Sequence, residues 1–234
     1  MENVQLGIHH LPYEYFNDTR LLKDLIYSNM IKNYYWSTDF SPAYYIAQAK
    51  AGFIAVTDYY EEEELLLPEI QFSYALLDFK DLHISKKVQK LIQKKNLQIE
   101  ITDDLDNVAE KINLSHKNCW LISRYLNTLK ETQGMDENFE IIAVILREKG
   151  ELIAGELGYI IGKTYTSLSG FSSRKKAYNH YGTAQLVLLA KYLEKEKFDF
   201  WNLGQPYMPY KLSLGAKIYD RHSFLKRWFS ITEK

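Results

Sequence analysis

The most constraining feature of this chain is the regular pattern of its second half. Residues 139–172 have the alternation of three strands joined by tight turns at residues 148–150 and 162–163, which predicts an antiparallel meander. A basic loop, an amphipathic helix at about residues 183–195 and an apolar strand at residues 198–203 follow. We expect that strand to return through the helix and pair in parallel with the meander, giving a mixed α/β (α+β) fold.

The first half of the chain has shorter and less regular elements. Its clearest helix follows Ser41, whose hydroxyl can cap free backbone amides, with Pro42 at the first helical position and Gly52 beyond the end. The acidic run at residues 61–64 is expected to be a solvated turn. Sequence patterns predict further helices at residues 21–31, 86–95, 105–114 and 118–131, and strands at residues 53–60, 71–79 and 97–101.

The length of 234 residues fits one large domain or two small ones. No segment rich in proline or serine separates the two halves, and the best candidate for a boundary lies near Asp136. We therefore predict a smaller N-terminal α/β part at residues 1–135 and a C-terminal domain at residues 136–234.

Charge and cysteine content exclude several classes of protein. The chain has 29 Lys and Arg against 30 Asp and Glu, so any surface for nucleic acid has to be local. The single cysteine, Cys119, excludes an intramolecular disulfide, and with no signal-peptide pattern it favours a cytoplasmic protein. His83, His116 and His180 lack metal-ligand spacing with one another or with Cys119, so no metal is predicted. No stretch approaches ~18 uninterrupted apolar residues, so no membrane span is expected.

One local basic surface lies in the predicted helix at residues 86–95. Ser85 precedes this helix as a cap, and Val88, Leu91 and Ile92 form its apolar face. The remaining positions carry five lysines and no acid, namely Lys86, Lys87, Lys90, Lys94 and Lys95. Two interpretations remain open: a solvated surface, or a patch that contacts phosphates.

A second candidate site is the junction between the basic loop and the long helix, where Tyr181 and Gly182 precede small residues. Free amides at a helix start bind anions, and a glycine there allows close approach of a ligand. In its meander–helix–strand setting, this junction resembles the acyl-donor-binding turn of GNAT-type N-acyltransferases. The resemblance implies a GNAT-like core with Tyr181 and Gly182 at the substrate, although Asn179 and the single glycine depart from the usual turn.

Polar residues follow the strand at residues 198–203, beside the end of the third meander strand. Adjacent strand ends that part leave unpaired amides, which can hold a carbonyl oxygen as charge develops on it, here near Ser169 and Phe171. Asn202 and Gln205 can orient an ester or an amine by hydrogen bonds, but neither titrates, so neither is a general base. The alternative is structural, with Asn202 capping a turn and Gln205 bonded to the loop backbone.

Four short motifs occur in order from Asp39 to Leu225, over most of the chain. They are Asp39-Phe40-Ser41-Pro42 with a helix that ends at Ala51-Gly52-Phe53-Ile54; Leu82-His83-Ile84-Ser85-Lys86; Cys119-Trp120-Leu121-Ile122; and Ser213-Leu214-Gly215-Ala216 followed by Arg221 and Phe224-Leu225. Together these motifs resemble the leucyl/phenylalanyl-tRNA–protein transferase family, which is built on a GNAT-like core.

The resemblance implies transfer of leucine or phenylalanine from aminoacyl-tRNA to the N-terminal amine of an acceptor protein, which marks that protein for degradation. It places Gln205, which matches the family's D-x-Q strand end, at the reacting ester. It also places Trp120 against the terminal adenosine by stacking, with core packing as the alternative. The lysines of residues 86–95 would meet the tRNA backbone, and no cofactor is implied beside the donor substrate.

The sequence departs from the family where acids are expected. Leu203 stands at the position of the Asp in D-x-Q, and Leu168 at the position of the Glu in G-E-S-M-F-S. The aromatic residue expected near Val56 is missing as well. The scaffold is therefore expected to be retained with altered site chemistry. Two alternatives remain: a GNAT-type N-acyltransferase that uses acyl-CoA, and a binding module that serves as an RNA or peptide adaptor.

Overall fold

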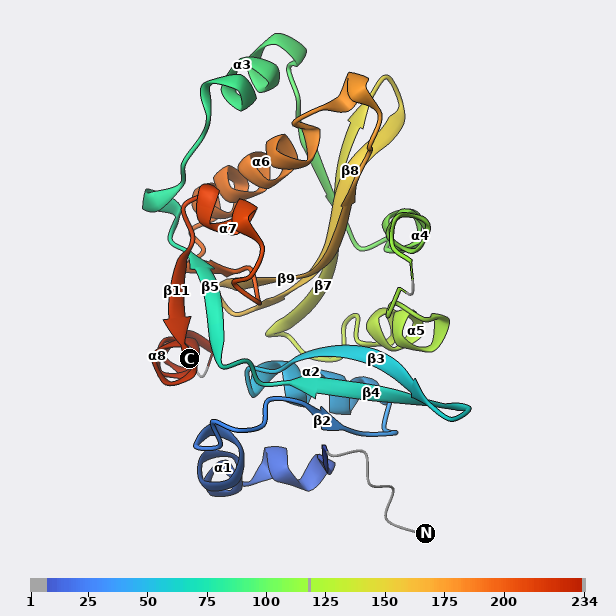
Figure 1. The fold of residues 1–234 in the computed structure, drawn as a ribbon, viewed down its shortest axis with the longest axis vertical. Coiled ribbons are helices and arrows are strands. Elements are labelled where there is room, and N and C mark those ends of the chain that lie inside the picture. Colours follow the sequence, from blue (N-terminus) through green and yellow to red (C-terminus); the bar gives the residue numbers. More distant parts are fainter. Residues whose placement is uncertain (1–7, 118, 233–234) are drawn as a thin grey trace.

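A seven-stranded sheet forms the centre of the computed structural model, which describes residues 8–117 and 119–232 (Figure 1). Its strands are β5 (Ser73–Leu77), β6 (Ile99–Thr102), β7 (Phe139–Glu148), β8 (Glu151–Ile161), β9 (Thr164–Ser172), β10 (Phe200–Asn202) and β11 (Lys217–Asp220). Their order across the sheet is β11-β5-β10-β9-β8-β7-β6. Helices pack on both faces, so the predicted mixed α/β class is confirmed.

The predicted meander and crossover are confirmed in the middle of this sheet. Strands β7, β8 and β9 pair antiparallel in sequence order. The chain then passes through helix α6 (Tyr181–Lys195) and returns as β10, which lies parallel to β9 with Phe200 opposite Thr164 and Asn202 opposite Thr166. The one parallel pair among the described strands of this sheet is thus the pair joined by α6.

Both predicted parts of the chain contribute to the sheet. Strand β5 lies antiparallel between β10 and β11, and β6 pairs with β7 at the opposite edge. Two strands from residues 1–135 therefore share hydrogen bonds with the strands of residues 136–234. The division of the chain at residues 135 and 136 stays a prediction.

A separate hairpin of β3 (Ile54–Tyr60) and β4 (Glu63–Glu69) packs beside the large sheet. The expectation of a turn throughout residues 61–64 is wrong for Glu63 and Glu64, which begin β4 because they pair with Tyr60 and Tyr59. The sequence patterns missed β4 altogether. A short parallel pair, β1 (His9–His10) with β2 (Tyr35–Trp36), completes the strands of the described chain.

The predicted helix starts are confirmed where a capping side chain marks them. The main helices are α2 (Pro42–Lys50), α3 (Lys86–Lys95), α4 (Asp106–Ser115), α5 (Ser123–Glu131) and α8 (Arg221–Thr232). The Ser41 hydroxyl accepts a hydrogen bond from the Tyr44 amide at the start of α2. The Ser85 hydroxyl accepts a hydrogen bond from the Val88 amide at the start of α3. Shorter helical segments are η1 (Tyr13–Asn17), α1 (Thr19–Leu21), η2 (Leu22–Tyr27), η3 (Phe79–Asp81), η4 (Lys176–Tyr178) and α7 (Pro209–Ser213).

Two predicted helix boundaries are wrong. The helix expected at residues 21–31 ends at Tyr27, the last residue of η2. Helix α5 begins at Ser123, not near residue 118, because Ile122 is extended with φ −71° and ψ 163°. Trp120 therefore lies in the segment before the helix. Of the residues predicted as helical here, Asn118 lies outside the described residues.

Within residues 8–117 and 119–232, no helix combines the length and apolar character that crossing a bilayer requires.

Two apolar cores hold the layers together, one on each face of the large sheet. Helix α6 and the apolar side of α3 cover one face, with Val88, Leu189 and Trp201 in the shared core. Helices α2, α4, α5 and α8 cover the other face, where Tyr125 and Trp228 are buried. Burying this apolar area supplies the main free energy of folding. Helix α3 uses only its apolar side in this way, so its lysines are left at the surface.

A close backbone contact fixes the start of α3 against the end of α7. The amide of His83 donates to the Leu214 carbonyl at 2.8 Å. Gly215 has φ +108°, and a Cβ there would overlap the Asp81 carbonyl oxygen, so only glycine fits without a backbone shift. Two of the four sequence motifs meet at this contact, which ties the segment before α3 to the residues that follow α7.

Candidate active site

The strands β9 and β10 run side by side only as far as the pair Thr166 and Asn202. Beyond that pair the chain follows β5: the Leu203 amide donates to the Ala75 carbonyl at 2.9 Å, and the Ala75 amide donates to the Gly204 carbonyl at 2.8 Å. Within the described chain, the remainder of β9 pairs with β8 alone. The two strand ends therefore part, as the sequence predicted, and leave one edge of β9 without a strand partner.

Asn202 shapes the turn after β10. Its side chain is 1% exposed, and its Oδ1 accepts the Gly204 amide at 2.9 Å. Gly204 has φ +71°, in the left-handed region that favours glycine. This is the contact expected of a turn cap, and it brings the chain round to Gln205. A direct catalytic role for Asn202 stays a prediction.

The side-chain amide of Gln205 is held by two oxygen atoms. Its Nε2 donates to Oε2 of Glu69 at 2.8 Å and to the hydroxyl of Tyr34 at 3.3 Å. An amide nitrogen has two hydrogens, so both donors of Gln205 are in use. Its oxygen Oε1 is left as the atom with which this partly buried side chain can meet a ligand.

Glu69 is the residue that sequence analysis missed. It ends β4, is 6% exposed, and also accepts from Nδ2 of Asn33 at 2.7 Å and from Nε2 of Gln71 at 3.4 Å. Burial raises the pKa of the Glu69 carboxyl above its ordinary value, while the surrounding donors oppose that shift. Burial and the nearby Glu69 raise the pKa of Tyr34 to about 12, so its hydroxyl stays neutral and can donate to the carboxylate.

Lys211 holds the backbone of the same turn. Its ammonium, on α7, donates to the carbonyl of Leu203 and to that of Gln205, the latter at 2.7 Å. The residue is 5% exposed, and burial lowers the pKa of its amine to about 8, partly offset by the attraction of Glu156. Gln205 is therefore fixed twice, through its backbone by Lys211 and through its side chain by Glu69.

A buried network lies where β9 and β10 separate. Glu156 on β8 accepts from the hydroxyls of Tyr165 at 3.0 Å and Ser167 at 2.8 Å, and from Nε2 of Gln185 at 3.2 Å. Trp201 on β10 donates its indole N–H to the Ser167 hydroxyl at 2.8 Å. Burial raises the pKa of Glu156. These bonds tie β8, β9, β10 and α6 together at the point of separation.

The predicted substrate-binding residues fall into two groups. Ser169 and Phe171 lie partly buried on the part of β9 beyond its pairing with β10. Tyr181 is buried at the start of α6 and donates its hydroxyl to Glu148, while a Cβ at Gly182 would lie 2.9 Å from the Cβ of Ser172. The glycine therefore permits close packing of α6 on β9. The binding roles of these residues stay predictions.

Trp120 is partly buried beside α5 and the β3–β4 hairpin. Its ring meets that of Tyr125 edge-on, with 5.1 Å between centroids, and its carbonyl accepts the hydroxyl of Thr57. These contacts are those of a packed side chain with some exposed area. Stacking of an adenosine on the remaining area stays a prediction.

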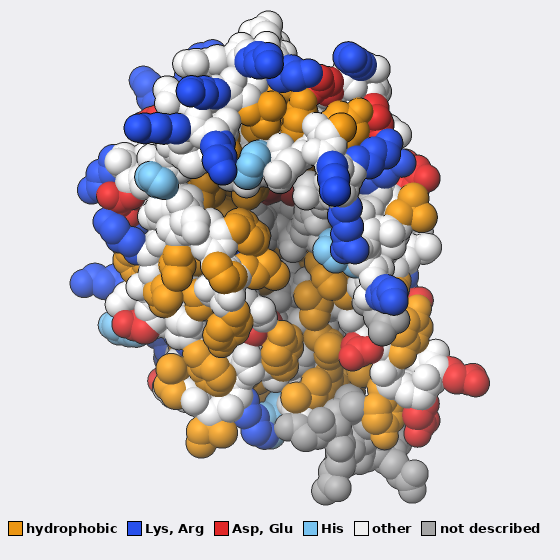
Figure 2. All heavy atoms as spheres, turned by 45° about the horizontal axis from the view of Figure 1, so that its top comes forward, with side chains coloured by type: hydrophobic (Ala, Val, Ile, Leu, Met, Phe, Trp, Pro, Cys, Tyr) orange, Lys and Arg blue, Asp and Glu red, His pale blue; other side chains and the backbone are white. Residues whose placement is uncertain are grey.

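The lysines of α3 form an exposed basic surface. Lys95 pairs with Glu148 at 2.7 Å, whereas Lys86, Lys87, Lys90 and Lys94 make no ion pair within the described part of the chain. Figure 2 shows Lys and Arg side chains gathered along the upper part of one face, above a hollow flanked by hydrophobic side chains. Because α3 lies at the top of Figure 1, which comes forward in this view, its lysines belong to this basic rim.

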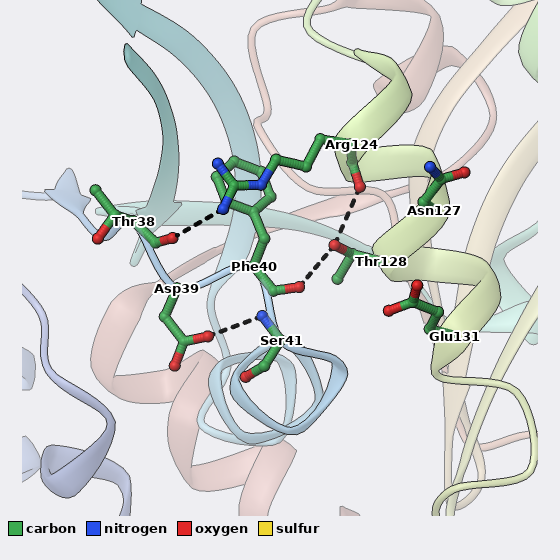
Figure 3. Close-up of a pocket in the computed structure, with 8 residues that line it drawn as sticks. All are labelled: Thr38, Asp39, Phe40, Ser41, Arg124, Asn127, Thr128 and Glu131. Carbon is green, nitrogen blue, oxygen red and sulfur yellow. Dashed lines mark hydrogen bonds between the residues drawn. The ribbon is translucent and has the colours of Figure 1, made fainter.

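A separate open cavity of about 430 Å³ lies at the first sequence motif (Figure 3). The Arg124 guanidinium lies over the Phe40 ring at 4.1 Å, and the Thr128 hydroxyl donates to the Phe40 carbonyl at 2.7 Å. Oδ1 of Asp39 accepts the Ser41 amide at 2.8 Å. These contacts join the start of α2 to α5, so the residues of this motif have a structural purpose.

Comparison with known families decides the identity of the scaffold. The family model described as leucyl/phenylalanyl-tRNA protein transferase matches residues 76–228, well over half of the chain. The chain belongs to this family. Family membership supports an aminoacyltransferase. A comparison with curated proteins finds no match.

Three solved structures are similar to the chain at low sequence identity. The C-terminal DUF2156 domain of a candidate lysylphosphatidylglycerol synthetase from Agrobacterium fabrum is 12% identical with a TM-score of 0.48, covering 82% of this chain and 71% of that one. FemX is 10% identical with a TM-score of 0.48, covering 69% of this chain and 64% of that one. L-PGS from Bacillus licheniformis is 12% identical with a TM-score of 0.40, covering 80% and 49% respectively. The chain thus spans less than two thirds of FemX and about half of L-PGS.

The family match and the geometry overlap at Gln205. The matched range contains β9, β10, α3 and the turn with Gln205, together with Leu168 and Leu203. Glu69 lies outside the matched range. The carboxylate that contacts Gln205 therefore comes from a strand outside the matched residues.

Proposed function

We propose that this protein transfers an amino acid from aminoacyl-tRNA to the N-terminal amine of an acceptor protein. The observation that carries the proposal is the fixed side chain of Gln205, at the motif position of the family and next to the parted ends of β9 and β10. The proposal includes a leucine- or phenylalanine-like donor residue, a cytoplasmic setting and marking of the acceptor for degradation.

The chemistry of this transfer depends on positioning more than on acid–base catalysis. The neutral amine of the acceptor attacks the carbonyl carbon of the aminoacyl ester; a C–N bond forms, the ester C–O bond breaks, and the tRNA 3′ oxygen leaves with the proton that the amine loses. The ester is already activated, and an α-amine with pKa ~8 is a competent nucleophile near neutral pH. Gln205 can orient the amine, and the β9 edge near Ser169 can hold the developing oxyanion. No cofactor is required.

Two exposed surfaces support a tRNA as the donor. The lysines of α3 offer cations for the phosphate backbone. Tyr207 and Tyr210, 77% and 45% exposed, follow Gln205 in the chain and offer faces for stacking of unpaired bases. The amide of His83, just before α3, donates to the Leu214 carbonyl, which follows α7. The basic surface suits the paired part of a tRNA, and the exposed tyrosines suit its single-stranded 3′ end.

Replacing Lys86, Lys87 and Lys90 with alanine should weaken tRNA binding and flatten its salt dependence. Each phosphate contact that is lost lowers the slope of log K against log salt by about one, so the triple variant should lose up to about three. Affinity is measured by fluorescence anisotropy with labelled tRNA over a series of salt concentrations. The matched control replaces Lys23, Lys163 and Lys226, which are exposed and lie outside α3. Equal losses in both triple variants would contradict a specific role for α3.

The proposed activity itself is tested by peptide mass. The protein is incubated with pools of aminoacylated tRNA and with peptides that differ only in the first residue. A mass gain of one amino acid in a subset of peptides is the expected result, and it names donor and acceptor together. Acetylation of the peptides from acetyl-CoA, with no gain from tRNA, would overturn the proposal in favour of an acyl-CoA enzyme. Tight tRNA binding with no product in either reaction would favour the binding module.

A further inference from the structure

Glu69 is a buried carboxylate. Hydrogen-bond donors surround it, and among the described residues no cation is in direct contact with it. Three neutral side chains donate hydrogen bonds to it, from Asn33, Gln71 and Gln205, and Tyr34 lies across a backbone bridge from it. No salt bridge to Glu69 occurs within the described residues. A buried charge without a counter-ion is costly, and it is kept only where its hydrogen bonds are good.

The position of Glu69 is set by several backbone contacts. It pairs with Ile54 across the β3–β4 hairpin, and Tyr34 bridges to it from the other side. The Ile70 amide also donates to the Asn33 carbonyl at 2.8 Å. These backbone contacts place the Glu69 carboxylate next to Gln205 at the end of a paired strand.

A carboxylate determines which way a neighbouring amide points. The two ends of a glutamine amide have nearly the same shape, so the hydrogen-bond network decides which atom is the nitrogen. An ionised carboxylate only accepts, so Nε2 of Gln205 has to face Glu69 and Oε1 has to face away. The Tyr34 hydroxyl accepts the second hydrogen bond from Nε2 of Gln205 at 3.3 Å. The orientation of Gln205 is thus fixed by its neighbours.

Gln71 donates a hydrogen bond to Glu69 while its own side-chain oxygen has no hydrogen-bond partner among the described residues. Its Nε2 donates to Glu69 at 3.4 Å, whereas its Oε1 is buried and has no hydrogen-bond partner among the described residues. Unpaired buried oxygens are rare in proteins, and they occur where a site imposes an arrangement. Here the imposed arrangement is a complete set of donors around Glu69.

We propose that Glu69 is a positioning residue for aminoacyl transfer: it locks the Gln205 amide so that Oε1 accepts a hydrogen bond from the attacking amine. The inference rests on the proposed function, because it assigns the amine to Gln205. It also supplies an acid at a site where Leu168 and Leu203 stand at the two positions for which the motif resemblance predicts acids. The acid comes from β4, in a different part of the chain.

The test compares two replacements of Glu69 in single-turnover transfer with the peptide that wild type modifies best. Glu69→Leu removes every acceptor, and the rate of transfer should fall about 100-fold with the KM for aminoacyl-tRNA unchanged. Glu69→Gln keeps the shape and one acceptor, and it should fall about tenfold. The matched control, Glu64→Gln, neutralises a carboxylate on the same strand that does not contact Gln205 and should keep the wild-type rate.

The decisive comparison is the double variant of Glu69→Leu with Gln205→Leu. If Glu69 acts through Gln205, the double variant should be no slower than Gln205→Leu alone, because the positioned group is already gone. Multiplication of the two losses would overturn the inference. Wild-type rates in both Glu69 variants would overturn it too while leaving the proposed function intact. Absence of any product with wild type would overturn both.

A second measurement covers the case in which Glu69→Leu folds poorly. The side-chain amide protons of Gln205, assigned in nitrogen-15 NMR spectra by their loss in Gln205→Leu, should be shifted and slow to exchange in wild type. In Glu69→Gln, which conserves volume, they should move and exchange faster. Unchanged Gln205 signals in that variant would show that Glu69 does not hold the amide, and would overturn the inference without reference to activity.

Discussion

Replacing Gln205 with leucine should lower the rate of amino-acid transfer about 100- to 1,000-fold while tRNA affinity stays the same. The side chain offers one free hydrogen-bonding atom, Oε1, beside the parted ends of β9 and β10. Leucine has similar bulk but no such atom, so the amine would lose its orientation toward the ester. Single-turnover kinetics with preloaded tRNA separates this step from binding, which is measured by fluorescence anisotropy.

The control for this substitution is Gln133→Leu. Gln133 also donates a side-chain hydrogen bond, to the Asp103 carbonyl at 2.7 Å, but it is exposed and lies after α5. Its loss should leave transfer at the wild-type rate. A Gln205→Leu protein that transfers at more than about a tenth of the wild-type rate would show that positioning comes from elsewhere on the β9 edge.

Two independent contacts explain why Gln205 is well placed for this role. Lys211 holds the carbonyls of Leu203 and Gln205, and Glu69 holds the side-chain amide. A functional group is effective when both its backbone and its side chain are restrained, because a displacement of about 1 Å can cost 100-fold in rate. Lys211 is six positions after Gln205 in the sequence, whereas Glu69 lies 136 positions before it.

The elements that sequence patterns predicted correctly are those with local signals. The Ser41 cap with Pro42 marks α2, the Ser85 cap marks α3, and tight turns with Gly150 and Gly162 separate the strands of the meander. Each of these signals acts within a few residues, so no knowledge of the rest of the chain is needed. The parallel return of β10 follows from the general behaviour of strand–helix–strand units.

The features that escaped prediction depend on contacts distant in sequence. Strand β4 begins with Glu63 and contains Pro68, and both are unusual in strands, yet pairing with β3 and with the segment before β2 makes it one. Its last residue, Glu69, carries no motif, and its value at the site comes only from meeting Gln205, 136 positions later in the chain. The predicted helix at residues 118–131 begins too early because Ile122, which has helical spacing to Tyr125 and Leu126, is extended.

The other large effect is expected on stability: replacing Arg221 with methionine should lower the free energy of unfolding by about 3–5 kcal/mol. Arg221 begins α8, is 1% exposed and forms no salt bridge within the described chain. Burial lowers the pKa of its guanidinium, which remains the charged form at any physiological pH. Its N–H groups donate to backbone carbonyls of Ile26, Tyr27, Asn29, Lys32, Ile70 and Gln71. Methionine would fill most of the volume and leave those buried carbonyls without a donor.

Urea unfolding of the wild type and of Arg221→Met measures this difference in the free energy of unfolding, provided that the free energy falls with urea at the same slope in both proteins. Arg221→Lys should be nearly as unstable, because one ammonium cannot reach carbonyls on two separate segments as the planar guanidinium does. The control is Arg147→Met, which removes an arginine whose ion pair with Glu100 is exposed; it should change stability by less than about 1 kcal/mol. A loss that small in Arg221→Met would show that water satisfies the carbonyls.

The location of Arg221 connects this stability effect to the active site. Two of its acceptors, Ile70 and Gln71, directly follow Glu69. A third, Lys32, precedes Asn33, which donates to Glu69, and Tyr34, which forms a backbone bridge with it. One guanidinium therefore holds both segments that build the surroundings of Glu69. We expect that in Arg221→Met the remaining folded protein transfers slowly even under conditions where it does not unfold. A normal rate in the folded fraction would show that the β4 end keeps its position without this clamp.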